Sequence, residues 1–166
     1  MINSVFDYFK VEKKHSVYCI VLGLLSVLLT IIFLVISEPL YNGIAYSLFA
    51  FGMIQLVIGI NVYLRCDMDS VSVDHFVHKD FNYLKGHEIP RMELEIKNLI
   101  VYSYAEIGCI ALGLLLWLYC NPLTLAKGIG IGLVIQSTIM LVVDFLAEQR
   151  GRVYLNFLKS LLKQES

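Results

Sequence analysis

Apolar residues fall along this chain in four long runs that are separated by polar stretches. The runs cover residues 17–37, 43–64, 100–120 and 125–147. Each contains the roughly 20 mostly apolar residues that an α-helix needs to cross the hydrocarbon core of a bilayer. The pattern predicts an all-α integral membrane protein, a four-helix bundle that occupies the whole chain as a single membrane domain, 1–166.

The positive charges predict how these helices are oriented. The N-terminal segment 1–16, the central segment 66–99 and the tail 148–166 carry most of the lysines and arginines, whereas the two short connections around Pro39 and Pro122 have only Lys127 close to them, at the start of the fourth run. By the positive-inside rule, both termini and the central segment are expected to be cytoplasmic. The chain would then form two in–out–in hairpins, and its compact size without eukaryotic sorting signals favours a bacterial inner membrane.

The two hairpins also share a sequence pattern. Val17-Tyr18 is followed 22 residues later by Pro39-Leu40, and Val101-Tyr102 is followed 21 residues later by Pro122-Leu123. Because both hairpins run in the same direction, a duplication would give a parallel repeat about an axis along the membrane normal. Apolar helices also resemble one another by composition alone, so both explanations remain open.

The segments outside the apolar runs also have helical spacing. Pro90 opens a pattern that continues without a helix breaker to Cys120, so the third helix is expected to begin well before residue 100. One face of the tail carries Tyr154, Phe157, Leu158, Leu161 and Leu162. The tail is expected either to lie in the membrane interface or to pack on the central segment, and the N-terminal segment around Phe9 is expected to be interfacial.

One carboxylate, Glu106, lies well inside an apolar run. A charged side chain at mid-bilayer costs at least ~2.5–3.5 kcal/mol on insertion scales, so Glu106 is expected to face the bundle or a wet cavity. The helical rise brings Asn61 and Asp144 to a similar depth, with Arg65 about one turn beyond Asn61 and Arg150 nearly two turns beyond Asp144. This polar cluster has two interpretations. Either an arginine neutralises Glu106 in a structural ion pair, or the carboxylate binds a proton or cation.

Two glutamines lie on helix faces that also carry glycines. Gln55 follows Gly52 in the second run, and Gln136 follows Gly132 in the fourth. Small residues at this spacing let membrane helices approach closely, and polar side chains between them hydrogen-bond across the interface. Gln55 and Gln136 are therefore predicted to be packing residues, with ligand binding as the alternative.

One short sequence resembles a metal site. Asp74 and His78 are four residues apart, and His75 and His78 are three apart, so they can share a helix face. A solvated cytoplasmic face is the better account of these residues, because no HExxH pattern or clear fourth ligand accompanies them. No metal centre and no cofactor is predicted.

Charge and composition narrow the classes of partner. The chain is 58% hydrophobic with a mean hydropathy of +0.72, and its net charge is −1. A nucleic-acid-binding protein needs a basic patch or stripe, so no nucleic acid is expected as a partner. The expected partners are membrane lipid and either further copies of the chain or another membrane protein.

Three functions follow from these patterns. The first is a protein that acts by binding, as a subunit, regulator or immunity-type partner of a membrane assembly. The alternative is a small proton- or cation-coupled carrier that uses Glu106. The third is an enzyme that modifies lipids at the inner leaflet, although the sequence offers no nucleophile at motif spacing.

Overall fold

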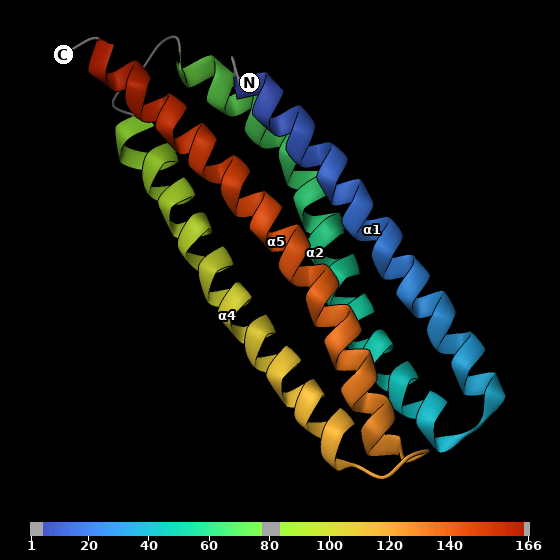
Figure 1. Ribbon diagram of the computed structural model, residues 1–166. Helices are drawn as coiled ribbons and strands as arrows, with labels where there is room; N and C mark the ends of the chain where they lie inside the picture. Colours follow the sequence, from blue (N-terminus) through green and yellow to red (C-terminus); the bar gives the residue numbers. More distant parts are fainter. Residues whose placement is uncertain (1–4, 78–83, 165–166) are drawn as a thin grey trace.

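The computed structural model describes residues 5–77 and 84–164, and these parts of the chain are built from helices (Figure 1). The elements are α1 (Val5–Ile36), α2 (Pro39–Val77), the π-helical turn η1 (Leu84–Glu88), α4 (Ile89–Tyr119) and α5 (Leu125–Gln164). The four long helices are each long and apolar enough to cross a membrane. The predicted all-α architecture of four apolar helices, typical of a multi-pass membrane protein, is confirmed.

The helices form two antiparallel hairpins with their turns at the same end of the molecule (Figure 1). We call this the turn end, and the opposite end, which holds both chain termini and η1, the charged end. Ser37 and Glu38 connect α1 to α2, and Ser37 adopts a left-handed backbone conformation with φ of 60°. The Ser37 hydroxyl donates a hydrogen bond to the Leu34 carbonyl at 3.1 Å, which closes α1.

The four helices are arranged as a curved row in the order α1, α2, α5, α4. Helix α1 packs along α2, α4 packs along α5, and the two hairpins meet mainly through α2 and α5. Helices α1 and α4 scarcely touch. The contact between the hairpins therefore depends mainly on the pair α2 and α5. Because α1 and α4, at the two ends of the row, scarcely touch, a space can remain between them.

The helices continue well beyond the predicted membrane spans at the charged end. Helix α5 has 40 residues and α2 has 39, which corresponds to roughly 60 Å each, about twice the ~30 Å hydrocarbon core. From Val5 onward the N-terminal segment is part of α1, and the tail continues α5 as far as Gln164. Pro90 lies in the first turn of α4, as expected, and η1 leads directly into that helix.

An aromatic core holds these extensions together at the charged end. It consists of Tyr8, Phe9, Cys66, Ile89, Met92, Tyr154 and Leu158, all of them buried. The rings of Tyr8 and Tyr154 stack with centroids 4.1 Å apart, and Phe9 meets Tyr154 edge-on. In the N-terminal segment, which was expected to be interfacial, the Phe9 side chain is buried against Tyr154 of α5. For the tail, the structure selects packing within the chain.

Glycines allow close helix contacts toward the turn end. Gly43 of α2 lies against Gly128 of α5, and Gly113 of α4 lies against Gly130 of α5. A Cβ atom built at Gly113 would lie 2.7 Å from the carbonyl oxygen of Gly130, so no larger side chain fits without movement. The turn end is therefore tightly packed, and space inside the molecule is expected near the charged end.

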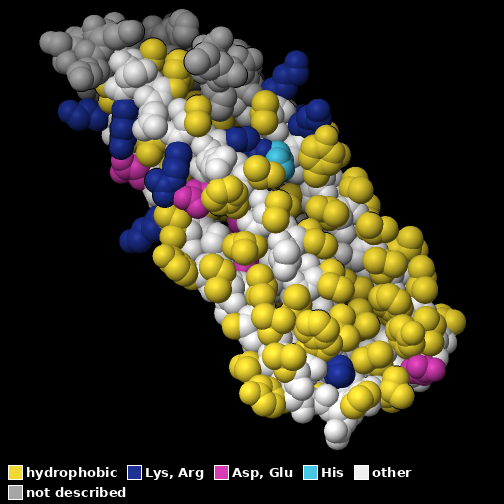
Figure 2. Space-filling model, viewed as in Figure 1, with side chains coloured by type: hydrophobic (Ala, Val, Ile, Leu, Met, Phe, Trp, Pro, Cys, Tyr) yellow, Lys and Arg dark blue, Asp and Glu magenta, His cyan; other side chains and the backbone are white. Residues whose placement is uncertain are grey.

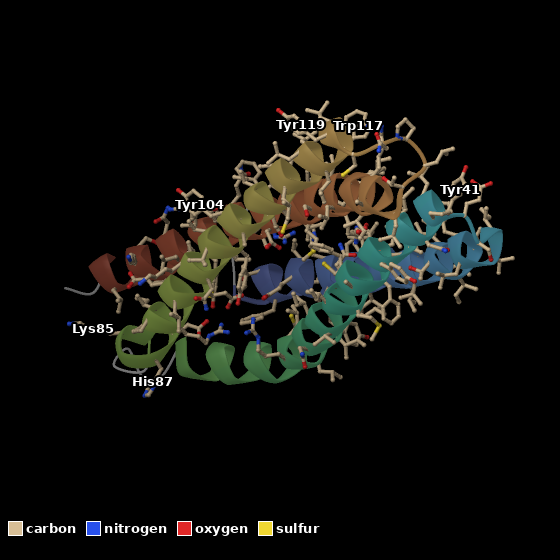
Figure 3. The ribbon with its side chains drawn as sticks, turned by 90° about the horizontal axis from the view of Figure 1, so that it is seen from below. Tyr41, Lys85, His87, Tyr104, Trp117 and Tyr119 are labelled. Atoms are coloured by element: carbon tan, nitrogen blue, oxygen red, sulfur yellow. The ribbon has the colours of Figure 1, made fainter. Side chains whose placement is uncertain are left out.

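Apolar and charged side chains are separated on the surface along the long axis of the molecule. On the face that Figure 2 shows, apolar side chains cover the part toward the turn end, and most lysines and arginines gather at the charged end. Tyr41, Trp117 and Tyr119 lie near the turn end (Figure 3), and the Tyr119 side chain is 83% exposed. Exposed Trp and Tyr near the ends of apolar helices are typical of residues at a membrane–water interface.

Candidate functional site

A cavity of about 110 Å³ lies inside the charged end, between all four long helices. It forms where α1 and α4 face each other across the row. Its polar lining residues are Glu12, His15, Ser16, Glu95, Asp144 and Arg150. The remaining wall is largely apolar and includes Ile58, Val62, Met92, Ile96 and Leu99. The cavity thus combines several carboxyl groups with a hydrocarbon wall.

Arg65 of α2 joins two of these carboxylates. Its Nη2 atom lies 3.3 Å from Glu12 Oε1 and 3.2 Å from Glu95 Oε1. Arg91 lies 3.8 Å from the other Glu95 oxygen. Glu12 is only 9% exposed, so its carboxylate depends on these partners for charge compensation. This network connects α1, α2 and α4 beside the cavity.

The structure therefore gives Arg65 different partners from those expected. The predicted cluster paired Arg65 or Arg150 with Glu106, whereas Arg65 bonds to Glu12 and Glu95. A long arginine side chain can extend along its helix toward the polar end of the bundle, where its charge is better solvated. Asn61 does not join the cluster either, because it is exposed on the outer face of α2, about 100° around the helix from Val62.

Glu106 is buried without a counter-charge in the described structure. Its side chain is 5% exposed, and neither carboxyl oxygen has a hydrogen-bond partner of ordinary geometry among the described residues. The ionisable group that acts on it is the carboxyl of Asp144, on the neighbouring helix α5. Asp144 also lines the cavity. The two acids that the sequence placed at one depth are thus brought together.

Arg150 lines the same cavity on α5, two turns beyond Asp144. It is half-buried, and among the described residues it makes no ion pair within 4.0 Å. The Glu12 carboxyl and the neutral Tyr8 hydroxyl act on it at longer range. Arg150 therefore contributes positive charge to the cavity without neutralising any single carboxylate.

A layer of hydrogen-bonded polar side chains lies deeper in the bundle than the cavity. Gln136 Nε2 donates to Gln55 Oε1 at 2.8 Å, and the Ser26 hydroxyl donates to Gln136 Oε1 at 3.4 Å. A small cavity of about 20 Å³, lined by Gln55 and Asp144 among others, lies between this layer and the carboxyl pair. Polar groups therefore extend from the charged end into the apolar interior.

This glutamine layer makes a testable contribution to stability. We expect Gln136→Leu to lower the unfolding free energy by ~0.6–2 kcal/mol, because it leaves the Gln55 amide without its buried partner. The double variant Gln55→Leu/Gln136→Leu is expected to recover part of this loss, since it removes both polar groups. SDS titration in mixed micelles of the wild type, the two single variants and the double variant measures the coupling between Gln55 and Gln136. Additive losses would show that the two side chains are not coupled.

The proposed metal residues are only partly described. Asp74 and His75 lie in the last turns of α2, where the structure gives the backbone but not the side chains, and His78 lies outside the described residues. The described part of the chain therefore does not test whether these three side chains meet. They are also separated in sequence from the cavity, whose α2 lining residues are Ile58, Gly59 and Val62.

Sequence reasoning missed three residues of the site: Glu12, His15 and Glu95. Glu12 lies in a charged stretch with three lysines and resembles a solvated residue, and Glu95 has a local partner in Arg91. The useful signal was that α1 and α4 continue as helices past the apolar runs. On a continuous α1, Glu12, Ser16 and Cys19 share one face with the buried Tyr8.

A second hollow lies on the outside of the bundle between α4 and α5. It is a groove of about 650 Å³, lined largely by apolar side chains, with Glu148 and Arg152 also in its lining. Tyr104 lines it and is 72% exposed (Figure 3).

No known protein family, no curated protein and no solved structure matches this chain. The function must therefore be argued from these two sites.

Proposed function

We propose that this protein binds a proton or a cation between its membrane helices and works as a small proton- or cation-coupled carrier. The observation that supports the proposal most directly is the burial of Glu106 beside Asp144, without a hydrogen-bond partner of ordinary geometry among the described residues. We also propose that the charged end faces the cytoplasm, since basic residues gather there, and that the membrane is a bacterial inner membrane.

The carboxyl pair supports this proposal through the cost of burying charge. Two carboxylates that act on each other in an apolar environment do not both stay ionised, because each raises the cost of charging the other. The site must therefore take up a positive charge, either as a proton on one carboxyl or as a bound cation. Ionisable groups inside membrane segments are also commonly those that carry protons or ions.

The architecture supports movement between two states. The cavity at the charged end leads to Asp144 and then to the glutamine layer, whereas glycine contacts close the turn end. The hairpins meet mainly through α2 and α5, so a rocking motion at this interface would change access without unfolding either hairpin. Rigid-body rocking of two halves around a central site is how many membrane carriers alternate access.

The proposal is tested with Glu106→Gln in proteoliposomes that contain a pH-sensitive dye. Gradients of sodium, potassium, guanidinium and alkylammonium chlorides are applied in turn, and the internal pH is recorded. We expect at least one cation to drive a protein-dependent pH change that Glu106→Gln abolishes. Glu93→Gln is the matched control, because Glu93 pairs with Lys159 on the exposed surface. Equal fluxes in Glu106→Gln and the wild type would contradict the carrier.

A second candidate is the function ranked first from the sequence, which is binding of another membrane protein as a subunit, regulator or immunity-type partner. The tail does not offer Tyr154 and Leu158 to a partner, because both side chains are fully buried within the chain. The groove between α4 and α5 favours this candidate, since a further membrane helix or a second copy of the chain fits such a groove. Cysteine cross-linking at position 104 in native membranes distinguishes a copy of the chain from a different partner.

A further inference from the structure

We propose that the cavity at the charged end binds a compact alkylammonium ion, and that this ion displaces the proton held by Glu106 and Asp144. The ammonium group would pair with the Asp144 carboxylate, and the alkyl part would lie on the apolar wall. The exchange is balanced, because one monovalent cation enters the site as one proton leaves it. This inference rests on the proposed carrier function and names its substrate class.

The size of the cavity sets the size of the ligand. A dry cavity of about 150 Å³ accommodates benzene, which has six heavy atoms, in another protein, so a cavity of about 110 Å³ has room for about four heavy atoms. The space here is about 110 Å³. Propylammonium meets this limit. A drug-sized cation does not fit without rearrangement of the helices.

The charge of the lining favours a cation over an anion. Three carboxyl groups line the cavity, from Glu12, Glu95 and Asp144. Among the described lining residues, Arg150 provides the one lysine or arginine side chain. Arg65 compensates part of the charge of Glu12 and Glu95. Asp144 makes no ion pair within 4.0 Å among the described residues. An entering cation therefore finds a carboxylate that the protein leaves available.

Glu106 is the independent sign that a positive charge belongs at this site. Its side chain is 5% exposed, its oxygens have no hydrogen-bond partner of ordinary geometry among the described residues, and the ionisable group that acts on it is the Asp144 carboxyl. A buried carboxyl in this state is satisfied only by a proton or a cation. Because Asp144 belongs to both the carboxyl pair and the cavity lining, one cation can act on both groups.

The wall chemistry distinguishes an alkylammonium ion from a metal ion. Metal ions such as calcium and magnesium require six or more oxygen ligands arranged around them. Here the carboxyl groups face hydrocarbon side chains from α2 and α4, including Ile58, Met92 and Leu99. Hydrocarbon packs well against an alkyl chain but does not replace the hydration shell of a metal ion. The Tyr8 ring, which also lines the cavity, is a further surface that attracts ammonium groups.

Several ionisable groups surround the exchange and determine its dependence on pH. They are Glu12, His15 and Cys19 of α1, Arg65 of α2, Glu95 and Glu106 of α4, and Asp144 and Arg150 of α5. The Nδ1 atom of His15 is buried without a hydrogen-bond partner in the described structure. Proton release must therefore be assigned to the carboxyl pair by substitution and not from the pH profile alone.

The experiment measures binding and proton release together, with the full-length protein in detergent. Propylammonium chloride is titrated into weakly buffered protein while heat and pH are recorded, and potassium chloride and propanol serve as comparisons. We expect propylammonium to bind and release a proton, and we expect neither comparison to do so. This selectivity needs no variant. Asp144→Asn is expected to weaken propylammonium binding by roughly tenfold or more, whereas Glu93→Gln leaves it unchanged.

Each contrary result has a definite meaning. Equal binding of propanol would show a merely apolar cavity and overturn the inference. Binding of propylammonium without proton release would overturn the exchange. Failure of propylammonium to bind, together with a Glu106-dependent pH change driven by sodium or potassium, would overturn the alkylammonium site and leave the carrier standing. Absence of any cation-driven flux would remove the carrier itself.

Discussion

Replacing Tyr154 with alanine is expected to lower the unfolding free energy by about 3–5 kcal/mol, the range for a large buried aromatic. Tyr154 is fully buried, and its ring stacks on Tyr8 and meets Phe9 edge-on. The substitution removes contacts between α5 and α1 that are distant in sequence. SDS titration in mixed micelles, followed by circular dichroism, measures the loss.

Two neighbouring substitutions show whether the ring is responsible. Tyr154→Phe keeps the ring and loses only the hydrogen bond from the hydroxyl to Glu88 at 3.3 Å, so we expect a loss of about 1 kcal/mol. Val153→Ala changes an adjacent side chain that is 51% exposed, and its effect should stay within about 0.5 kcal/mol. A loss for Tyr154→Ala no larger than that for Val153→Ala would show that the tail is not docked.

The aromatic core also determines how the cavity is held open. Tyr8 and Met92 belong both to this core and to the cavity lining. Core side chains close-packed on one side fix the positions of the helices that carry them. The separation of α1 from α4 at the charged end is therefore maintained by the packing of the aromatic core beside the cavity. The cavity between these helices can stay open because no side chain is needed inside it to hold them apart.

The sequence was sufficient to predict the helices but not their arrangement. Four apolar runs of membrane length specify four long helices almost independently of tertiary contacts, because each run must satisfy its own backbone hydrogen bonds in lipid. The row order α1, α2, α5, α4 depends on which faces pack, and apolar side chains on all sides of a membrane helix leave no clear periodic signal. The continuity of α1 and α5 with their polar extensions was missed for a related reason. A change in polarity was read as a boundary, whereas the backbone has no helix breaker there.

The candidate site was predictable only where one residue conflicted with its surroundings. Glu106 and Asp144 were found because acids are costly in apolar runs. Arg65 was given the wrong partner, because helical rise gives depth along the membrane but not the direction of a long side chain. Glu12 was missed since an acid among lysines is ordinary in sequence, and its burial depends on α4 and α2 closing over it.

The close approach of α2 and α5 leads to the second large prediction, for Gly128→Val. A Cβ atom at position 128 would overlap the Leu40 carbonyl oxygen and lie 3.0 Å from the Gly43 Cα atom. Both obstacles are backbone atoms, which cannot move aside as a flexible side chain does. We therefore expect a loss of about 3 kcal/mol or more in unfolding free energy, at the upper end of the cost of overpacking.

The matched control for this prediction is Gly108→Val, on α4. A Cβ atom at Gly108 meets no atom within 4 Å, so the same change of side chain should alter the unfolding free energy by less than about 1 kcal/mol, through helix propensity alone. SDS titration of the two variants and the wild type measures the difference. If Gly128→Val is as stable as Gly108→Val, the hairpins do not meet at this glycine contact. Since α2 and α5 provide most of the contact between the hairpins, that result would also remove the hinge on which the rocking motion depends.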